Sequence, residues 1–383
     1  MKSLIGHFLL MWIIMREKLT FLPKLALILF CLISLTYIAI LGQSLLAPLL
    51  FSFLMAILLL PVGNFLEQKF RLKRSLATIV AVILMIAVIG GIMYFFGNQL
   101  SDLWADWPLL KQKANISFHE LQHWISITFR VNTEKQLAYL NDSTEKALAT
   151  SATIVATTLA TLSSTLLFLG FTLLFTFFIL NYRRVLFTFL TSVFKEEHKE
   201  KVTEIVSQIQ YIIKKYIIGL FLQMLIVTIL MIAVLSLLGV KYAVLLGLVA
   251  GIFNVVPYLG IFFALLISCL ITFATAGAGK VLLVLITFIG VHAINGNILV
   301  PLVVGSKVKI NALFAFLGII VGEMVWGISG MFLCIPYLAM LKIIFDRVDN
   351  LKPWGILMGE EHKPAKKKRV YQITKKIKLE EKD

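Results

Sequence analysis

The chain is dominated by apolar runs of close to 20 residues, separated by short polar or basic stretches. A helix needs about 20 apolar residues to cross a hydrocarbon core of about 30 Å. The runs lie at 25–42, 45–61, 76–97, 154–180, 217–239, 242–258, 259–276, 281–303 and 310–345. This pattern predicts an all-α membrane protein, a polytopic helical bundle of about eight transmembrane helices.

The composition favours the same class. Hydrophobic residues make up 60% of the chain and charged residues 15%, whereas soluble domains are about half apolar and about a quarter charged. Cys31, Cys269 and Cys334 lie far apart within apolar runs. Their spacing matches neither a disulfide framework nor a metal site. We therefore expect no metal and no cofactor.

The net charge of +16 is concentrated in four places: the N-terminal stretch, residues 69–74, residues 181–216 and the C-terminal tail. Lys and Arg are enriched in cytoplasmic loops. Counting the predicted spans so that these basic stretches lie in the cytoplasm predicts that both termini are cytoplasmic and that residues 98–150 lie outside. Because the charge follows membrane topology, the lipid bilayer and not nucleic acid is the expected partner. The lysine-rich tail is expected to be a disordered anchor at anionic headgroups, with specific docking as the alternative.

These features divide the chain into successive parts. They are a cytoplasmic or interfacial segment (1–24), three transmembrane helices (25–97), an extracytoplasmic amphipathic region (98–150), a transmembrane helix (151–180), a cytoplasmic amphipathic region (181–216), a C-terminal transmembrane transport region (217–345) and a basic cytoplasmic tail (346–383). Broken or re-entrant helices are expected in the C-terminal half. There, 310–345 forms either a hairpin or two short spans, because residues 326–330 interrupt the helix.

Glu323 is the only acidic residue between Glu204 and Asp346. A carboxylate inside a bilayer costs at least about 2.5 kcal/mol on insertion scales, which makes it a functional candidate. It could couple transport to a proton or cation, with His292 or the lysines at 307 and 309 as partners. Alternatively, it lies at a helix end and reaches interfacial water.

His292, Asn295 and Asn297 form a second group of transport candidates, within an apolar run. His292 and Asn295 are three residues apart and share a helix face. Their side chains could line a solute path, or could simply form hydrogen bonds between helices. Neither a second His nor a carboxylate is near in sequence, so a metal site is not predicted.

Gly247, Gly251 and Asn254 form a stripe that allows close helix packing, and Pro257 and Gly260 follow it. Either a tight packing face or a broken helix exposed to substrate would explain this pattern. The other positions predicted to break or pack helices are Pro301, Gly327, Gly330 and Pro336.

The order of Pro257-Tyr-Leu-Gly260, Asn297-Ile-Leu-Val-Pro301, Gly327-Ile-Ser-Gly330 and Ile335-Pro336 resembles the autoinducer-2 exporter (AI-2E) family. The resemblance extends over about residues 25–350. It implies a bacterial inner-membrane permease of about eight spans that forms a homo-oligomer, with a pentamer as the candidate stoichiometry. Members of this family are linked to export of autoinducer-2, and some to sodium/proton antiport.

Enzymatic signatures such as a Walker loop, HExxH or a nucleophile elbow are absent from the sequence, so we expect a non-enzyme. The leading hypothesis is a gradient-driven permease for a small polar solute. The alternatives are a monovalent cation/proton antiporter that uses Glu323, and a membrane scaffold or regulator.

Overall fold

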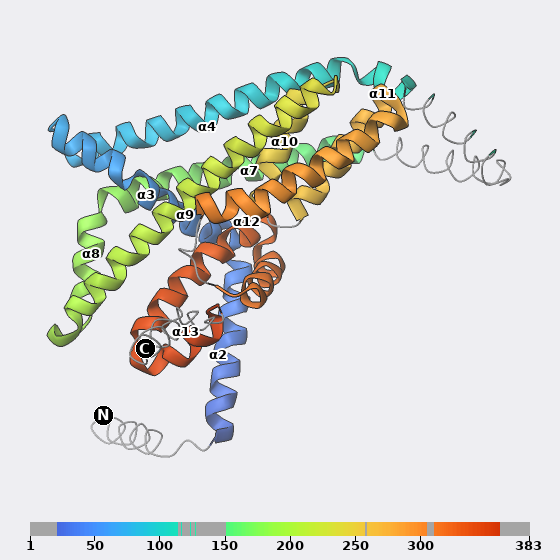
Figure 1. Cartoon of the computed structure of the whole chain (residues 1–383). Helices are drawn as coiled ribbons and strands as arrows, with labels where there is room; N and C mark the ends of the chain where they lie inside the picture. Colours follow the sequence, from blue (N-terminus) through green and yellow to red (C-terminus); the bar gives the residue numbers. More distant parts are fainter. Residues whose placement is uncertain are drawn as a thin grey trace, which may run out of the picture.

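The computed structural model describes residues 21–113, 116, 123, 127, 151–256, 259–304 and 310–360. Within these residues it contains helices and no strand (Figure 1), which confirms the predicted all-α class. Six helices are long and apolar enough to cross a membrane, and two shorter apolar helices, Leu25–Leu41 and Ala243–Phe253, accompany them. Most of the predicted 1–24 and 98–150 segments and of the 346–383 tail lies outside the described residues.

The N-terminal half consists of α2 (Phe21–Leu41), α3 (Gln43–Lys69), α4 (Arg74–Ala105) and α7 (Ser151–Asn181). Helices α3, α4 and α7 pack together around the buried side chains of Leu59, Met85 and Leu180. The Ser75 hydroxyl donates to Asn181 Oδ1 at 3.1 Å, which fixes the start of α4 beside the end of α7. By contrast, α2 touches only α3 and α12 among the described elements and stands apart from the bundle (Figure 1).

Helix α9 (Glu196–Leu237) is the axis of the molecule. Its 42 residues give a length of about 63 Å at 1.5 Å per residue. It follows α8 (Arg183–Ser192) and contacts α3, α10, α11 and α12. At its end the chain turns through Gly239 and Tyr242, whose φ angles are 63° and 63°. This turn returns α10 (Ala243–Phe253) along α9.

Helix α11 (Leu259–Ile294) is broken at Gly277, where φ is 77° and ψ is 179°. An L side chain rarely adopts such a φ, so glycine allows the reversal. The two arms lie against α9 and α10. The second arm continues into η1 (Asn295–Val304), a π-helix.

Helix α12 (Ala312–Arg347) is broken at Trp326 and at Gly327, where φ is 59°. A Cβ atom on Gly322 would lie 2.5 Å from the Gly330 carbonyl oxygen, so the two arms are in direct backbone contact. The first arm, residues 312–325, is about 21 Å long, shorter than a core of about 30 Å. The backbone contact between the arms makes the segment a helical hairpin in shape. The short η3 (Asp349–Leu351) and α13 (Lys352–Met358) follow it.

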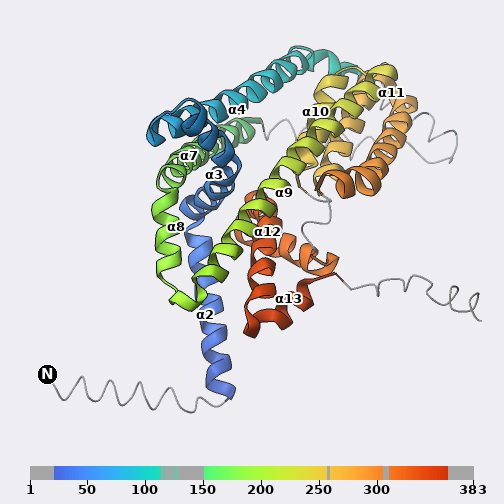
Figure 2. The same ribbon diagram turned by 60° about the vertical axis from the view of Figure 1, so that its left-hand side comes forward.

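Among the described elements, α12 has no contact with α10, α11 or η1. Figure 2 shows the α10–α11 group and the α12–α13 group at different places along α9. Two regions with broken helices therefore share one axial helix. We call them the amide region (the second half of α9 with α10, α11 and η1) and the hairpin region (α12 with its contacts on α2 and α3).

Candidate functional site

Three side-chain amides from different elements meet inside the amide region. Gln223 comes from α9, Asn254 caps the C-terminus of α10 and Asn295 is the first residue of η1. Gln223 Nε2 donates to Asn295 Oδ1 at 2.9 Å. Asn295 Nδ2 donates in turn to Asn254 Oδ1 at 3.0 Å. We call this chain of bonds the amide cluster.

Two of the three amides are buried, since only 8% of Gln223 and 5% of Asn295 are exposed, and Asn254 is half-buried. A buried polar group without a partner costs roughly 1–3 kcal/mol, so mutual bonding accounts for their presence among apolar residues. An amide carries two N–H donors and an acceptor oxygen. The two bonds described leave one N–H on Gln223, one on Asn295, both on Asn254, and the Gln223 oxygen, so the cluster keeps capacity to bind a further polar group.

Local helix geometry brings Asn295 into the cluster. At this residue the chain passes from α-helix to π-helix, a change often found at functional sites. Asn297, two positions later, is exposed, and its Nδ2 donates to the Ala293 carbonyl at 2.9 Å. Asn297 therefore forms a hydrogen bond within its own helix, whereas Asn295 forms hydrogen bonds with side chains of α9 and α10. Pro301 lies further along η1.

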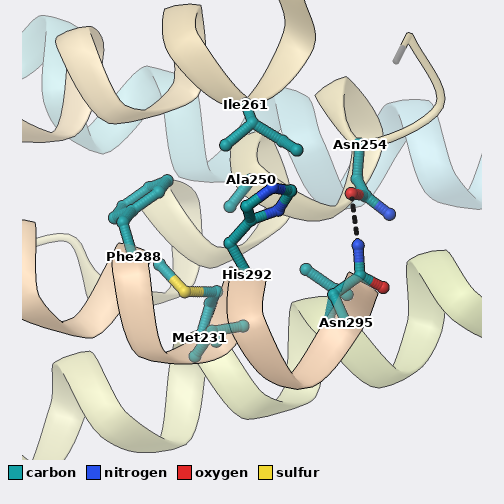
Figure 3. Close-up of a pocket in the computed structure, with 9 residues that line it drawn as sticks. Met231, Ala250, Asn254, Ile261, Phe288, His292 and Asn295 are labelled. Carbon is teal, nitrogen blue, oxygen red and sulfur yellow. Dashed lines mark hydrogen bonds between the residues drawn. The ribbon is translucent and has the colours of Figure 1, made fainter. Parts of the chain in front are cut away.

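A small cavity of about 20 Å³ lies beside the amide cluster. Its lining is Val227, Met231, Ala250, Asn254, Ile261, Phe288, Val291, His292 and Asn295. Figure 3 shows His292 next to the Asn254–Asn295 pair, with its ring directed toward Ile261 and Ala250. A water molecule needs a cavity of about 10–15 Å³. The cavity therefore has room for about one water in this conformation.

The glycine stripe allows α10 to pack closely against α9 beside the cavity. A Cβ on Gly247 would lie 2.8 Å from the Ile232 backbone nitrogen, and one on Gly251 would lie 2.9 Å from the Met224 carbonyl oxygen and would clash with Thr228 Oγ1. Gly260 similarly faces the Phe253 carbonyl. Close backbone contact therefore positions Asn254 against η1. Pro257 lies outside the described residues.

An ion cluster joins α4 to the α9–α10 turn. Asp106 Oδ2 accepts from Lys241 Nζ at 2.6 Å and from the Tyr242 hydroxyl at 2.5 Å. The Lys241 bond, then the Tyr242 bond, holds the pKa of Asp106 below its ordinary value. The bond to Asp106 raises the pKa of Lys241. Lys280, near the α11 break, donates to the Gly239 carbonyl at 2.8 Å. The same turn is thereby fixed to two neighbouring helices.

Glu323 lies in the hairpin region, three residues before the break at Trp326. Its side chain is exposed on the surface of the chain. The structure does not bring it to His292, because α12 and α11 make no contact within the described residues. The other partners considered, the lysines at 307 and 309, lie outside those residues. Gly330 and Pro336 are buried in the second arm.

Two hydrogen bonds attach the hairpin to the N-terminal helices, one from its tip and one from its second arm. Trp326 Nε1 donates to the Ala39 carbonyl at 2.8 Å, and the Tyr337 hydroxyl donates to the Leu50 carbonyl at 3.0 Å. Ala39 belongs to the last turn of α2, where carbonyls lack a partner in their own helix. The tip therefore caps α2 at the point where it joins α3.

Sequence reasoning did not single out Gln223. The available signal is a lone amide within the apolar run Leu220-Phe-Leu-Gln-Met-Leu-Ile, since polar residues inside spans are costly and face a protein interior or a cavity. Asp106 and Lys241 were equally hard to connect, because 135 positions separate them.

Known proteins resemble this chain over most of its length or over part of it. The model of a family described as AI-2E family transporter matches residues 28–350. YrrI of Bacillus subtilis (strain 168), named provisionally as a transport protein, is 37% identical over 106 residues, 28% of this chain and 30% of YrrI. TqsA of Escherichia coli (strain K12), named AI-2 transport protein, is 28% identical over 131 residues, 34% of this chain and 38% of TqsA. The match spans about a third of the length of these curated relatives.

Proposed function

The chain belongs to the AI-2E family of transporters, and from that premise we propose that it is a permease for a small uncharged polar solute. In this proposal the solute passes the amide cluster of Gln223, Asn254 and Asn295. The single observation that carries it is the pair of bonds joining these amides inside an apolar bundle. Such a cluster is the kind of polar surface that a solute would need within the membrane.

The chemistry of the lining favours an uncharged solute. Amides both donate and accept hydrogen bonds, as hydroxyl and carbonyl groups of a solute require. His292 is the one titratable side chain among the residues that line the described cavity. An ion without a compensating charge would lose its hydration at a large cost in free energy. The name of TqsA makes AI-2 the first solute to test.

Passage requires an opening motion, because the cavity of about 20 Å³ holds about one water. We propose that the arms of α11 move relative to α9, with the Gly277 break and η1 as the points of bending. Discontinuous helices beside a substrate site are common in transporters. Since the sequence contains no nucleotide-binding motif, the proposed driving force is the gradient of the solute or of a coupled ion.

We further propose a plasma-membrane location, the inner membrane where there are two, with both termini cytoplasmic, as the basic loops predict. A homo-oligomer is also proposed. Its support is the exposure of Glu323 on an apolar hairpin, because a carboxylate facing lipid is costly. A neighbouring copy, or water held between copies, would remove that cost.

A second candidate function is monovalent cation/proton antiport through Glu323. It is supported by the isolation of this carboxylate within α12, whose other acidic residue, Asp346, lies in the last turn. Ion coupling in a membrane protein commonly uses such a residue. In this mechanism Glu323 would release a proton and bind a cation at the surface of the hairpin.

Flux measurements in proteoliposomes separate the two candidates. We expect AI-2 or a small hydroxylated solute to move down its own gradient without an imposed pH or sodium gradient. Glu323→Gln is expected to retain at least about half of this flux, because the hairpin has no contact with the cavity. Flux that requires an imposed ion gradient and is lost in Glu323→Gln would instead support antiport. Folded protein that moves neither solutes nor ions would contradict both candidates.

A further inference from the structure

Two adjoining cavities lie where α3, α7, α8, α9 and α12 converge, away from the amide cluster. One has a volume of about 240 Å³ and the other about 550 Å³. They share lining residues that include Leu60, Arg183 and Gln210. Both are therefore parts of one continuous groove, which we call the α8 groove. The larger part alone lies within the range of about 300–1,000 Å³ that is typical of small-molecule sites.

The two parts of the α8 groove differ in chemistry. The smaller part is walled mainly by apolar side chains from five helices, among them Phe53, Ile57, Leu186, Ile209 and Met340. The larger part has more polar side chains in its lining, including Arg184, Thr188, Thr203 and Ser207, beside apolar ones such as Leu60 and Phe187. An apolar trough that ends in a cationic, hydroxyl-lined mouth matches an amphiphile with an acyl chain and an anionic head.

One of the two arginines at the mouth of the groove, Arg184, is available to bind an anion. Arg183 is 16% exposed, and its guanidinium donates hydrogen bonds to Leu180 O at 3.1 Å, Asn64 Oδ1 at 2.8 Å and Glu67 Oε1 at 2.7 Å. Arg184 is 67% exposed and reaches Glu67 only at 3.5 Å. One carboxylate thus faces two guanidinium groups, and Arg184 keeps most of its donors free. A guanidinium fork suits the oxygens of a phosphate group.

The groove also lies where a membrane lipid could enter it. Val185, Phe189 and Val193, at α8 and directly after it, are 61%, 65% and 62% exposed. Apolar side chains exposed in this way beside basic residues are typical of a helix in the membrane interface. The same end of the bundle carries Arg71 and Lys73 in the α3–α4 connection. Basic clusters at this level attract anionic lipids.

We propose that the α8 groove binds one anionic phospholipid, with an acyl chain in the apolar part and its phosphate at Arg184, Thr188 and Ser207. This site is separate from the proposed solute path and does not depend on it. Because α3, α7, α8, α9 and α12 all line the groove, the lipid would join the hairpin region to the N-terminal helices.

Native mass spectrometry of the purified full-length protein tests the headgroup part of this proposal. Phosphatidylglycerol and phosphatidylcholine with identical acyl chains are added in equal amounts. We expect preferential retention of phosphatidylglycerol, and loss of that preference in Arg184→Gln. Arg71→Gln is the matched control, since it removes the same charge from the same end of the bundle, and it should keep the preference. Equal loss in both variants, or in neither, would overturn the proposal.

The proposed position of the acyl chain is tested with a phosphatidylglycerol that carries a photoreactive group on that chain. Cross-links in the wild-type protein should map to α8 and to residues 206–210, and Ala56→Trp, which fills the apolar part, should abolish them. The wild-type mapping is informative even if this variant fails to fold. Excess inorganic phosphate should not displace the lipid; displacement would mean that the mouth binds free phosphate instead. Cross-links confined to helices that do not line the groove would overturn the proposal.

Discussion

The amide region and the hairpin region are both built from helices that break inside apolar sequence, but they place their polar side chains in opposite ways. In the amide region, Gln223 and Asn295 are buried and bonded to each other. In the hairpin region, the two arms are in glycine–glycine contact, and Glu323 is exposed on the surface of the chain. A broken helix is therefore not sufficient to identify a solute path.

This difference in exposure separates two roles, lining a solute path and acting at the surface, which the sequence alone does not distinguish. A polar group enclosed within the chain can line a path through it, whereas an exposed carboxylate faces lipid, water or another molecule. The amide region is thus the better candidate for solute passage. The hairpin region, through Trp326 and Tyr337, mainly holds α2 and α3 in place.

The largest expected effect concerns the packing that positions Asn254. Gly251→Leu would drive a side chain into the Met224 carbonyl and Thr228, and overpacking typically costs about 1–3 kcal/mol. Because the obstacle here includes backbone, we expect loss of most folded protein, measured as the monodisperse yield after detergent extraction. Gly290→Leu on α11 is the control, since a Cβ there has no neighbour within 4 Å in the described structure. Normal folding and transport in Gly251→Leu would contradict the packing role.

A smaller effect is expected in the hairpin region. Gly330→Ala would push a methyl group against the Gly322 backbone, and the arms would have to separate at a cost of about 1–3 kcal/mol. A lower unfolding temperature with solute flux kept within about twofold is the expected result. Gly91→Ala on α4, where a Cβ meets open space, controls for the added methyl group. Complete loss of flux in folded Gly330→Ala would show that the two regions are not independent.

The weakest effect concerns the ion cluster that fixes the α9–α10 turn. The pKa of Asp106 is lowered from 3.8, so its contribution to stability is present above that pH and is lost as pH falls through its pKa in the folded protein. The pKa of Lys241 is raised from 10.5, so its contribution is complete below that pH and is lost as pH rises further. Asp106→Asn should therefore lower the unfolding temperature slightly near neutral pH. The difference should vanish in strong acid.

The comparison for this measurement is Asp102→Asn, one turn earlier on α4, which should follow the wild-type pH profile. A deficit of Asp106→Asn that persists unchanged in strong acid would mean that the carboxylate charge is not the cause. Lys113 also acts on Asp106. Lys113→Gln should therefore produce a smaller change in the same direction.

Much of the fold could be predicted, because segment length and local breaks are properties of contiguous sequence. The interruption at residues 326–330 predicted a break in α12, and the division between 276 and 281 fell beside the Gly277 break. The site was only partly predictable. Asn295 was a candidate, but its partner Gln223 is 72 positions away. Likewise, whether Glu323 approaches His292 depends on where α11 and α12 pack along α9, and no local sequence pattern encodes that packing.

The central claim is that the solute passes the amide cluster, and Asn295 and Asn297 provide its most direct test. In Asn295→Leu, Gln223 and Asn254 lose their described side-chain partner, at about 1–3 kcal/mol for each group left unsatisfied. Asn297→Leu removes only a bond to its own helix at Ala293. Initial flux of the solute into proteoliposomes, at matched amounts of folded protein, should fall at least about tenfold in Asn295→Leu and stay within about twofold in Asn297→Leu. Equal flux in the two variants would contradict the claim.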